Sequence, residues 1–471
     1  MNKVKLGEVA DVKLSSVDKK TMPNEREVKL CNYTDVYKNW SIRNDMTNNF
    51  MIATCDESEF EKFILKKGQV AITKDSETPD DIGVSAYISE NFENVVLGYH
   101  LALITPFSNK LDGQFLNYYF HAKHSQKYFE NNAGGSGQRC SLSIDTIKET
   151  PLLLPDFPTQ TAIARVLSSL DDKIELNNKI NKELENLVKT IYEYWFVQFN
   201  FPNTEGKPYK SNDGKMVYNK DLKRVIPENW EVKKLNSIVR NISDSTQSGE
   251  HLNKMFYTPL DEIPMHKMSF WGGLSYNEAK SSLQLYKKND ILLGAMRVYF
   301  HRVCIASQNG ITRSTTIVLR ANKQEYIPYI FELINMDSTI VYATMQSAKS
   351  QQPYVNWENE LAEYKFAFPS NMDIIDKYSR VTMQLVKQVK TNEKENYELT
   401  QLRDFLLPLL MDGQVTVGKA QDEPTIKLLK KFANNDTKYQ TWKTQIGLAA
   451  RGDIDEQTLH NIYEAIDEND R

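Results

Sequence analysis

The 471-residue sequence lacks the features of membrane and secreted proteins. No apolar run approaches the roughly 18 to 20 residues needed to cross a bilayer. The N-terminal segment has no apolar centre like that of a signal peptide, so we expect a cytoplasmic protein without a membrane partner. Cys31, Cys55, Cys140 and Cys304 are far apart, which fits neither a disulfide framework nor a metal site and predicts reduced thiols.

The common catalytic motifs are also missing. The sequence contains no Gly-x-x-x-x-Gly-Lys-Ser/Thr phosphate loop and no Gly-x-Gly-x-x-Gly after a predicted strand, which argues against nucleotide binding. The adenine methyltransferase signature of Asp or Asn, two prolines and an aromatic residue is absent. His121 and His124 have no adjacent acid, so no metal site is predicted. We expect no catalytic centre, although groups distant in sequence could still meet in an unfamiliar active site.

Two long helices dominate what the sequence does contain. Apolar residues recur three and four positions apart through 157–199, without Gly or Pro after Pro158, and again through 370–415. The two segments align at an offset of 215 residues, which pairs Asn177 with Asn392 and Leu184 with Leu399. The chain therefore reads as a repeat.

Shorter landmarks recur in the same order outside the helices. Residues 66–70 match 287–291, and residues 99–104 match 314–319. We predict an α+β fold with two mixed α/β domains in tandem repeat and two long antiparallel helices, related by a pseudo-twofold axis. The alternative is that each long helix packs only on its own globule. The predicted boundaries are 1–156 for the first domain, 157–199 for the central helix, 200–228 for a polar linker, 229–369 for the second domain, 370–415 for the second helix and 416–471 for an extension of unknown role.

The residue pattern favours nucleic-acid binding over other functions. Net charge is −4, yet the segment 265–320 carries eight basic residues and two acidic ones, with aromatic residues between them. Loops 135–139 and 347–352 occupy equivalent places in the two halves and carry small residues and amides, which can contact base edges. The alternative is that these loops are ordinary polar turns. The candidate DNA contacts are Lys74, Ser136, Gln138, Arg139, Lys267, Trp271, Arg297, Arg302, Arg313, Lys349, Gln351, Gln352 and Tyr354.

The order of these features resembles the specificity subunit of type I restriction-modification enzymes across about residues 1–415. The resemblance rests on the opening KLGEVADV, a Gly-Ser-Gly-Gln loop, the run PLLLPDFPTQTAIARVLSSLDDKIELNNKINKELENL and the restart IPENWEVKKL. The second copy lacks the Gln-x-x-Ile-Ala helix entry of residues 160–164. The resemblance implies that two target recognition domains each read one half of a split double-stranded DNA site.

The same resemblance implies the partners and cofactors. Two modification subunits, which methylate adenine, would dock on the helices, and restriction subunits with translocase activity would join them. S-adenosylmethionine, ATP and Mg would then be bound by those partners and not by this non-catalytic chain. The helix residues expected to serve pairing and subunit docking are Ile163, Leu167, Leu170, Ile174, Leu184, Leu187, Val381, Leu385, Leu399 and Leu402. The main alternative is a coiled-coil assembly scaffold without sequence-specific DNA binding.

Overall fold

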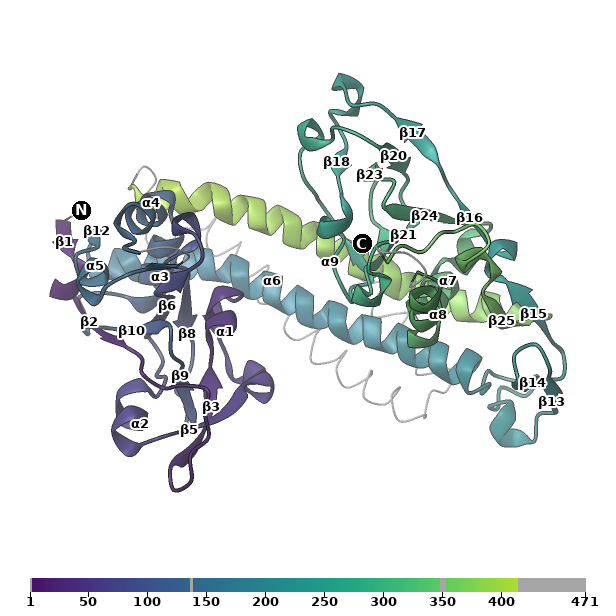
Figure 1. Cartoon of the computed structure of the whole chain (residues 1–471), viewed down its shortest axis with the longest axis horizontal. Helices are drawn as coiled ribbons and strands as arrows, with labels where there is room; N and C mark the ends of the chain where they lie inside the picture. The colour runs from purple at the N-terminus through teal and green to yellow at the C-terminus, as the bar shows by residue number, and fades with distance from the viewer. Residues whose placement is uncertain (1, 136–138, 348–352, 414–471) are drawn as a thin grey trace. The chain divides into compact units, whose positions relative to one another are not determined.

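The computed structural model describes residues 2–135, 139–347 and 353–413, and these form two compact units. The first unit contains the chain up to Asp172 together with the segment that begins at Leu399. The second unit contains Lys173–Glu398. Figure 1 labels the helices and strands along the chain.

The first unit is built on a five-stranded sheet with the order β2-β10-β6-β8-β4. A three-stranded sheet, β5-β3-β9, and the pairs β1-β12 and β7-β11 accompany it. Its strands are β1 (Asn2–Lys5), β2 (Ala10–Leu14), β3 (Arg26–Cys31), β4 (Ser41–Ile42), β5 (Met51–Cys55), β6 (Val70–Thr73), β7 (Asp75–Ser76), β8 (Ser85–Ile88), β9 (Val95–Leu97), β10 (Leu101–Pro106), β11 (Cys140–Ser141) and β12 (Pro151–Leu154). Its helices are α1 (Tyr33–Tyr37), α2 (Glu57–Phe63), α3 (Gly113–His121), α4 (Lys123–Asn132) and α5 (Ile144–Lys148).

The second unit repeats this plan with the sheet β16-β24-β21-β22-β19. A four-stranded sheet, β17-β20-β23-β18, and the pairs β13-β14 and β15-β25 accompany it. Its strands are β13 (Met216–Asn219), β14 (Arg224–Pro227), β15 (Trp230–Lys234), β16 (Val239–Asn241), β17 (Asp244–Thr246), β18 (Phe256–Tyr257), β19 (Ser269–Phe270), β20 (Leu283–Tyr286), β21 (Ile291–Gly294), β22 (Val303–Ala306), β23 (Gly310–Arg313), β24 (Thr316–Ala321) and β25 (Lys365–Pro369). Its short helices are α7 (Ile327–Asn335) and α8 (Asp337–Ser347).

The two five-stranded sheets share one topology. In each, the outer strand β4 or β19 pairs in parallel with its neighbour, and the pairings at the other positions are antiparallel. The matched landmarks occupy the same places, because Leu101 begins β10 and Thr316 begins β24. The turn before β6 and β21 is also repeated: the amide of Lys66 donates to Gln69 Oε1 at 2.7 Å, and that of Lys287 to Asp290 Oδ2 at 2.7 Å.

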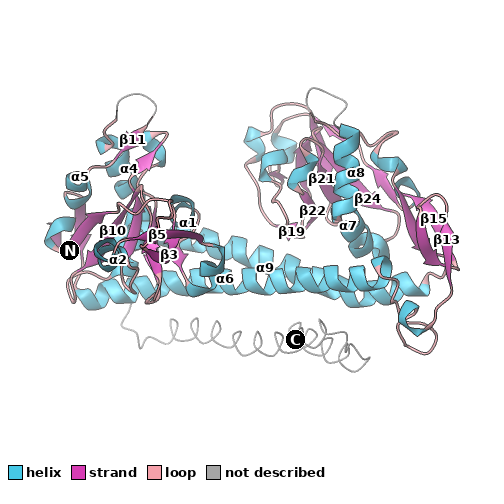
Figure 2. Ribbon diagram, turned by 60° about the horizontal axis from the view of Figure 1, so that its bottom comes forward, coloured by secondary structure: helices cyan, strands magenta, loops and turns pink. Residues whose placement is uncertain are grey.

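Two long helices, α6 (Phe157–Tyr192) and α9 (Asp373–Met411), contribute to both units. Gln160 anchors the start of α6, since its side chain accepts from the amide of Asp112 and donates to the carbonyl of Lys110. In the first unit Ile163 and Leu167 share a core with Leu407. The helices are drawn in cyan in Figure 2.

Within the second unit, α6 and α9 run antiparallel around a centre of asparagines. Asn177 Nδ2 donates to Asn396 Oδ1 at 2.9 Å, and Asn392 Nδ2 donates to Asn181 Oδ1 at 2.8 Å. In the repeat, Asn177 corresponds to Asn392, and Asn181 corresponds to Asn396. Each asparagine of α6 therefore bonds to the repeat partner of the other one. Buried amides of this kind fix the register of paired helices, since any shift would leave them without partners.

One helical segment is broken, and one predicted linker is structured. Residues 114–130 do not form a single helix, because the chain breaks at Ala122 between α3 and α4, where Ser125 Oγ donates to the carbonyl of Tyr119 at 2.7 Å. Segment 200–228 was expected to be a linker, but it carries the β13-β14 hairpin. Phe201 holds that segment on the second unit by stacking on Trp230, with ring centroids 5.3 Å apart.

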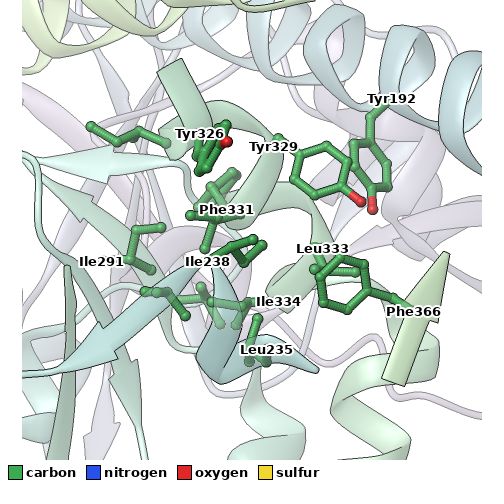
Figure 3. Packing of buried hydrophobic residues seen from close by; sticks show 14 of the residues in the cluster. Tyr192, Leu235, Ile238, Ile291, Tyr326, Tyr329, Phe331, Leu333, Ile334 and Phe366 are labelled. Carbon is green, nitrogen blue, oxygen red and sulfur yellow. The ribbon is translucent and has the colours of Figure 1, made fainter. Parts of the chain in front are cut away.

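Aromatic residues fill the core between the second sheet and its helices. Figure 3 shows Tyr192 of α6 beside Tyr329 of α7, and their ring centroids lie 5.5 Å apart. Phe366 of β25 packs on the same cluster. The end of α6 passes into a π-helical turn, Glu193–Val197, whose Phe196 contacts Tyr329 edge to face at 4.8 Å. This burial keeps the helix end attached to the second sheet.

Glu332 of α7 is a buried carboxyl beside this core. Because of it, we predict that the stability of the folded chain depends on pH. It is 4% exposed, and burial raises its pKa from 4.5 to about 8. The folded chain then holds a proton that the unfolded chain releases, so stability falls as pH rises from about 4.5 to about 8, by up to about 1.4 kcal/mol per pH unit. Glu332→Gln is expected to remove this slope in urea titrations at pH 5 and pH 8. The exposed Glu262→Gln serves as control, and an unchanged slope in Glu332→Gln would contradict the assignment.

Candidate nucleic-acid interface

One edge of each five-stranded sheet has the same backbone framework. In the first unit the amide of Lys74 donates to the carbonyl of His100 at 3.1 Å, and the amide of Leu142 donates to that of Lys74 at 2.7 Å. In the second unit Ala295 donates to Thr315 at 3.0 Å, and Val355 donates to Ala295 at 3.0 Å. The residues that follow β6 and β21 therefore lie in matching positions beside the segments that follow the two candidate loops.

The first unit places four interacting side chains at this edge. Asp75 Oδ2 lies 2.9 Å from Lys74 Nζ and 2.5 Å from His100 Nδ1. The Lys74 ammonium lies 5.3 Å from the centroid of the Tyr99 ring, and Tyr99 packs on His100 with centroids 4.0 Å apart. Hydrogen bonds from His100, Lys74 and Ser141 outweigh burial and lower the pKa of Asp75. The result is a carboxylate that holds two cationic or polar groups next to an exposed aromatic ring.

The neighbouring β11 strand brings Arg139 toward the same edge. Cys140 pairs with Ser76 of β7, and Gly134 and Ser141 exchange backbone hydrogen bonds at 3.0 and 2.7 Å. Arg139 precedes this pairing and is exposed. Its side chain can therefore reach a phosphate while the backbone pairing of β11 with β7 is kept.

The second unit carries different chemistry at the matching edge. Arg297 and Arg313 are exposed, and Arg297 has left-handed backbone geometry with φ 49°. The amide of Arg297 donates to the carbonyl of Pro353 at 3.0 Å, and the Tyr354 hydroxyl donates to the carbonyl of Ser314 at 3.1 Å. The framework is thus common to both units, while the side chains differ.

A cavity of about 340 Å³ lies in the second unit. It is lined by Tyr299, His301, Asp337, Ile340, Val341, Thr344 and Met345. Tyr299, Val341 and Met345 are exposed at 47%, 56% and 67%, so their apolar groups reach the surface. Apolar groups of this kind can contact a thymine methyl in the major groove.

Three of the predicted contacts have internal roles. Arg302 Nη1 donates to the carbonyls of Asp261, at 2.9 Å, and of Ile263. Lys267 Nζ lies 3.6 Å from Glu393 of α9, and Lys394 Nζ lies 5.5 Å from the ring centroid of Trp271. Arg302, Lys267 and Trp271 therefore help to hold the second unit together, which reduces the basic charge of 265–320 that is free for DNA.

Five of the predicted contacts lie outside the described residues, namely Ser136, Gln138, Lys349, Gln351 and Gln352.

Most of the helix residues predicted for pairing and docking are internal. Seven side chains are buried in the units' own cores, namely Ile163, Leu167, Leu170, Leu184, Leu187, Leu385 and Leu399. Ile174 and Val381 are partly buried, whereas Leu402 is 39% exposed. The structure therefore places the buried seven in the cores of this chain.

Sequence reasoning missed Asp75, Tyr99 and His100 as site residues. Tyr99 and His100 were recognised only as a landmark before a buried strand. The signal that could have found them is that the matching positions in the second half, Ser314 and Thr315, carry no ring. The left-handed geometry of His100, with φ 72°, cannot be read from the sequence.

Across the described ranges, no group of three His, Cys, Asp or Glu side chains is arranged to hold a metal ion. No helix in the described part of the chain combines the length and apolar character needed to span a bilayer.

Comparison with known proteins agrees with this architecture. Residues 1–186 match the family model described as the type I restriction modification DNA specificity domain. The MjaIX specificity subunit of Methanocaldococcus jannaschii is 26% identical over 321 residues, which cover 64% of this chain and 69% of that protein. The HindI specificity subunit of Haemophilus influenzae is 23% identical over 416 residues, covering 75% and 88%. The crystal structure of the type I system S subunit from M. genitalium has a TM-score of 0.53 at 15% identity, covering 87% of this chain and 95% of that one.

The shared sheet topology and the unequal side chains at matching edges define a duplicated architecture. Residues 1–186 carry the DNA specificity domain of type I restriction modification, and the chain is similar to specificity subunits of type I restriction enzymes over 64% to 75% of its length.

Proposed function

We propose that this DNA-recognition subunit reads a bipartite target, with one half-site contacted by each unit. The observation that carries the proposal is the repeated sheet edge, where one framework bears Lys74, Asp75, Tyr99 and His100 in one unit and Arg297, Arg313 and Tyr354 in the other. A common framework suits a common way of approaching duplex DNA. Unequal side chains suit two different half-sites, because base edges are distinguished by their hydrogen-bond patterns.

We further propose that α6 and α9 set the spacing between the half-sites and dock two methyltransferase subunits. The exchanged asparagine bonds support this role, since they fix one antiparallel register of the helices. In this proposal the helices form a coiled-coil spacer and the two target recognition domains are related by a pseudo-twofold axis.

The chemistry of the complex is assigned to its other subunits. S-adenosylmethionine would bind to the modification subunits, whereas ATP and Mg would bind to the restriction subunits that translocate DNA. This chain would contribute no catalytic residue and bind no cofactor. A cytoplasmic complex follows from the need to reach chromosomal DNA.

Lengthening both helices by one turn tests the spacer role. Four residues inserted after Lys179 and four after Glu393 leave the bonds between Asn177 and Asn396 and between Asn181 and Asn392 on either side of the insertion. The insertion adds about 6 Å. We expect the methylated motif to keep both half-sites and to gain one or two base pairs between them, at about 3.4 Å per base pair. An unchanged gap in a folded variant would remove the spacer role.

A further inference from the structure

The edge of the first unit has the form of a base-reading site built on His100. Asp75 Oδ2 accepts a hydrogen bond from His100 Nδ1 at 2.5 Å, so the carboxylate favours the imidazole form with its proton on Nδ1. The other ring nitrogen, Nε2, then offers a lone pair. Among the described residues, no hydrogen bond is made by His100 Nε2.

Two features aim this imidazole outward. His100 has left-handed backbone geometry with φ 72°, which is uncommon outside Gly but is adopted by His more often than by most residues, and its side chain is 36% exposed. Strain of this kind is concentrated at functional sites. Tyr99 flanks the imidazole and is 48% exposed, so an aromatic face and a hydrogen-bond acceptor lie side by side.

The repeat offers an internal comparison for these side chains. Thr315 has the same backbone hydrogen bond as His100, and Ser314 and Thr315 occupy the landmark positions of Tyr99 and His100. The backbone of this edge therefore forms without a ring at the positions of Tyr99 and His100. A structural requirement of the framework does not explain why the first unit carries them.

We propose that Tyr99 and His100 are specificity-determining residues of the first unit, and that Asp75 is the positioning residue that orients His100. His100 Nε2 accepts a hydrogen bond from the exocyclic amino group of an adenine or cytosine in the major groove. The Tyr99 ring packs against the adjacent nucleotide. The Lys74 ammonium neutralises Asp75 and keeps the edge from repelling phosphate. This assignment rests on the proposed function and names residues that carry it.

Selection from a pool of random duplexes tests the assignment. The full chain, assembled with its methyltransferase subunits, is incubated with double-stranded oligonucleotides that contain randomised positions, and the bound duplexes are sequenced. His100→Gly suits this test because Gly accepts the positive φ and removes the imidazole. We expect the preference at one position of one half-site to fall about 10-fold, with the other half-site unchanged. Tyr99→Ala is expected to relax the adjacent position.

Asp75→Asn distinguishes positioning from general stability. It should relax the same single position as His100→Gly, and the double variant should be no worse than His100→Gly alone, because both act through one contact. Phe107→Ala is the matched control, since this ring lies beyond the opposite end of β10, is 40% exposed and has Lys110 Nζ 5.6 Å from its centroid. We expect Phe107→Ala to leave the whole motif intact.

The outcomes separate this inference from the function on which it rests. A wild-type complex that selects a bipartite motif, together with His100→Gly and Tyr99→Ala variants that select the same motif unchanged, would overturn the assignment and leave DNA recognition in place. Equal relaxation of both half-sites would also overturn it, because a base contact acts on one half only. A wild-type complex that selects no motif would overturn both.

Discussion

Binding of the assembled complex to its target DNA is expected to weaken about 10³- to 10⁵-fold between 50 and 200 mM salt, if six to ten phosphates are neutralised. Each neutralised phosphate releases counterions, so the logarithm of the binding constant falls linearly with the logarithm of the salt concentration. The chain has a net charge of −4, so this attraction must come from local basic side chains such as Arg139, Arg297 and Arg313.

The salt titration has an internal control in single arginine substitutions. Arg139→Ala is expected to reduce the salt slope by about one and to weaken binding to all sequences alike, since its exposed side chain can reach a phosphate. Arg302→Ala is not expected to lower the salt slope in this way, because the Arg302 guanidinium donates to the carbonyls of Asp261 and Ile263 within the chain. A salt-independent affinity measured by fluorescence anisotropy would contradict a phosphate-contacting role for the complex.

Arg403→Met is expected to destabilise the first unit by about 3 to 5 kcal/mol, because it leaves a buried carboxylate without its partner. Arg403 Nη1 lies 2.8 Å from Asp171 Oδ1, and the Tyr118 hydroxyl donates to Asp171 Oδ2 at 2.5 Å. The Arg403 guanidinium also stacks 4.2 Å above the Trp40 ring centroid. One arginine of α9 thus joins a carboxylate of α6 to the globular part of the first unit.

The loss in Arg403→Met should depend on pH in a defined direction. Burial already raises the pKa of Asp171, and removal of the guanidinium will raise it further. The folded variant therefore binds a proton that the unfolded chain releases, so its stability falls as pH rises above the ordinary carboxyl range. Urea titration at pH 5 and pH 8 should show the larger loss at pH 8.

Two further variants control this measurement. Lys127→Ala removes an exposed pair with Glu130, 64% and 36% exposed, and is expected to cost at most about 0.5 kcal/mol. The double variant Arg403→Met with Asp171→Asn should recover part of the loss, because no charge is left unpaired. A loss below about 1 kcal/mol in Arg403→Met would show that the buried pair contributes little to the unit.

The two long helices were the part of the fold that the sequence predicted best. The offset of 215 residues between Asn177 and Asn392 comes from helical periodicity, which depends on local spacing alone. The structure adds which residues meet, since Asn177 bonds to Asn396 and not to its own repeat partner. The strand landmarks were visible for a similar reason, because buried strands carry continuous apolar runs in both halves.

Features that depend on tertiary contact could not be predicted. The polar segment 200–228 hides its hairpin because Phe201 is isolated in the sequence and finds Trp230 only in the fold. The break at Ala122 was hidden for another reason: it has no Gly or Pro of its own, and the Ser125 hydroxyl stabilises it by a local hydrogen bond to the carbonyl of Tyr119.

The candidate site was predicted less completely than the fold. Arg297 and Arg302 were both predicted as DNA contacts because both are basic. In the structure Arg302 bonds to carbonyls within the chain, while Arg297 is exposed. The association of Asp75 with His100 joins residues 25 positions apart, and only the pairing of β6 with β10 brings them together. Charge counts along a sequence cannot separate internal arginines from free ones.

Sequencing of methylated DNA tests the central claim most directly. Genomic DNA is compared between cells that express this chain together with its modification subunit and cells that express the modification subunit alone. We predict a new methyladenine motif made of two short half-sites separated by a fixed number of unspecified bases, present only when this chain is expressed. The same methylation pattern in both cultures, or a single continuous motif, would contradict the reading of a bipartite target by two units.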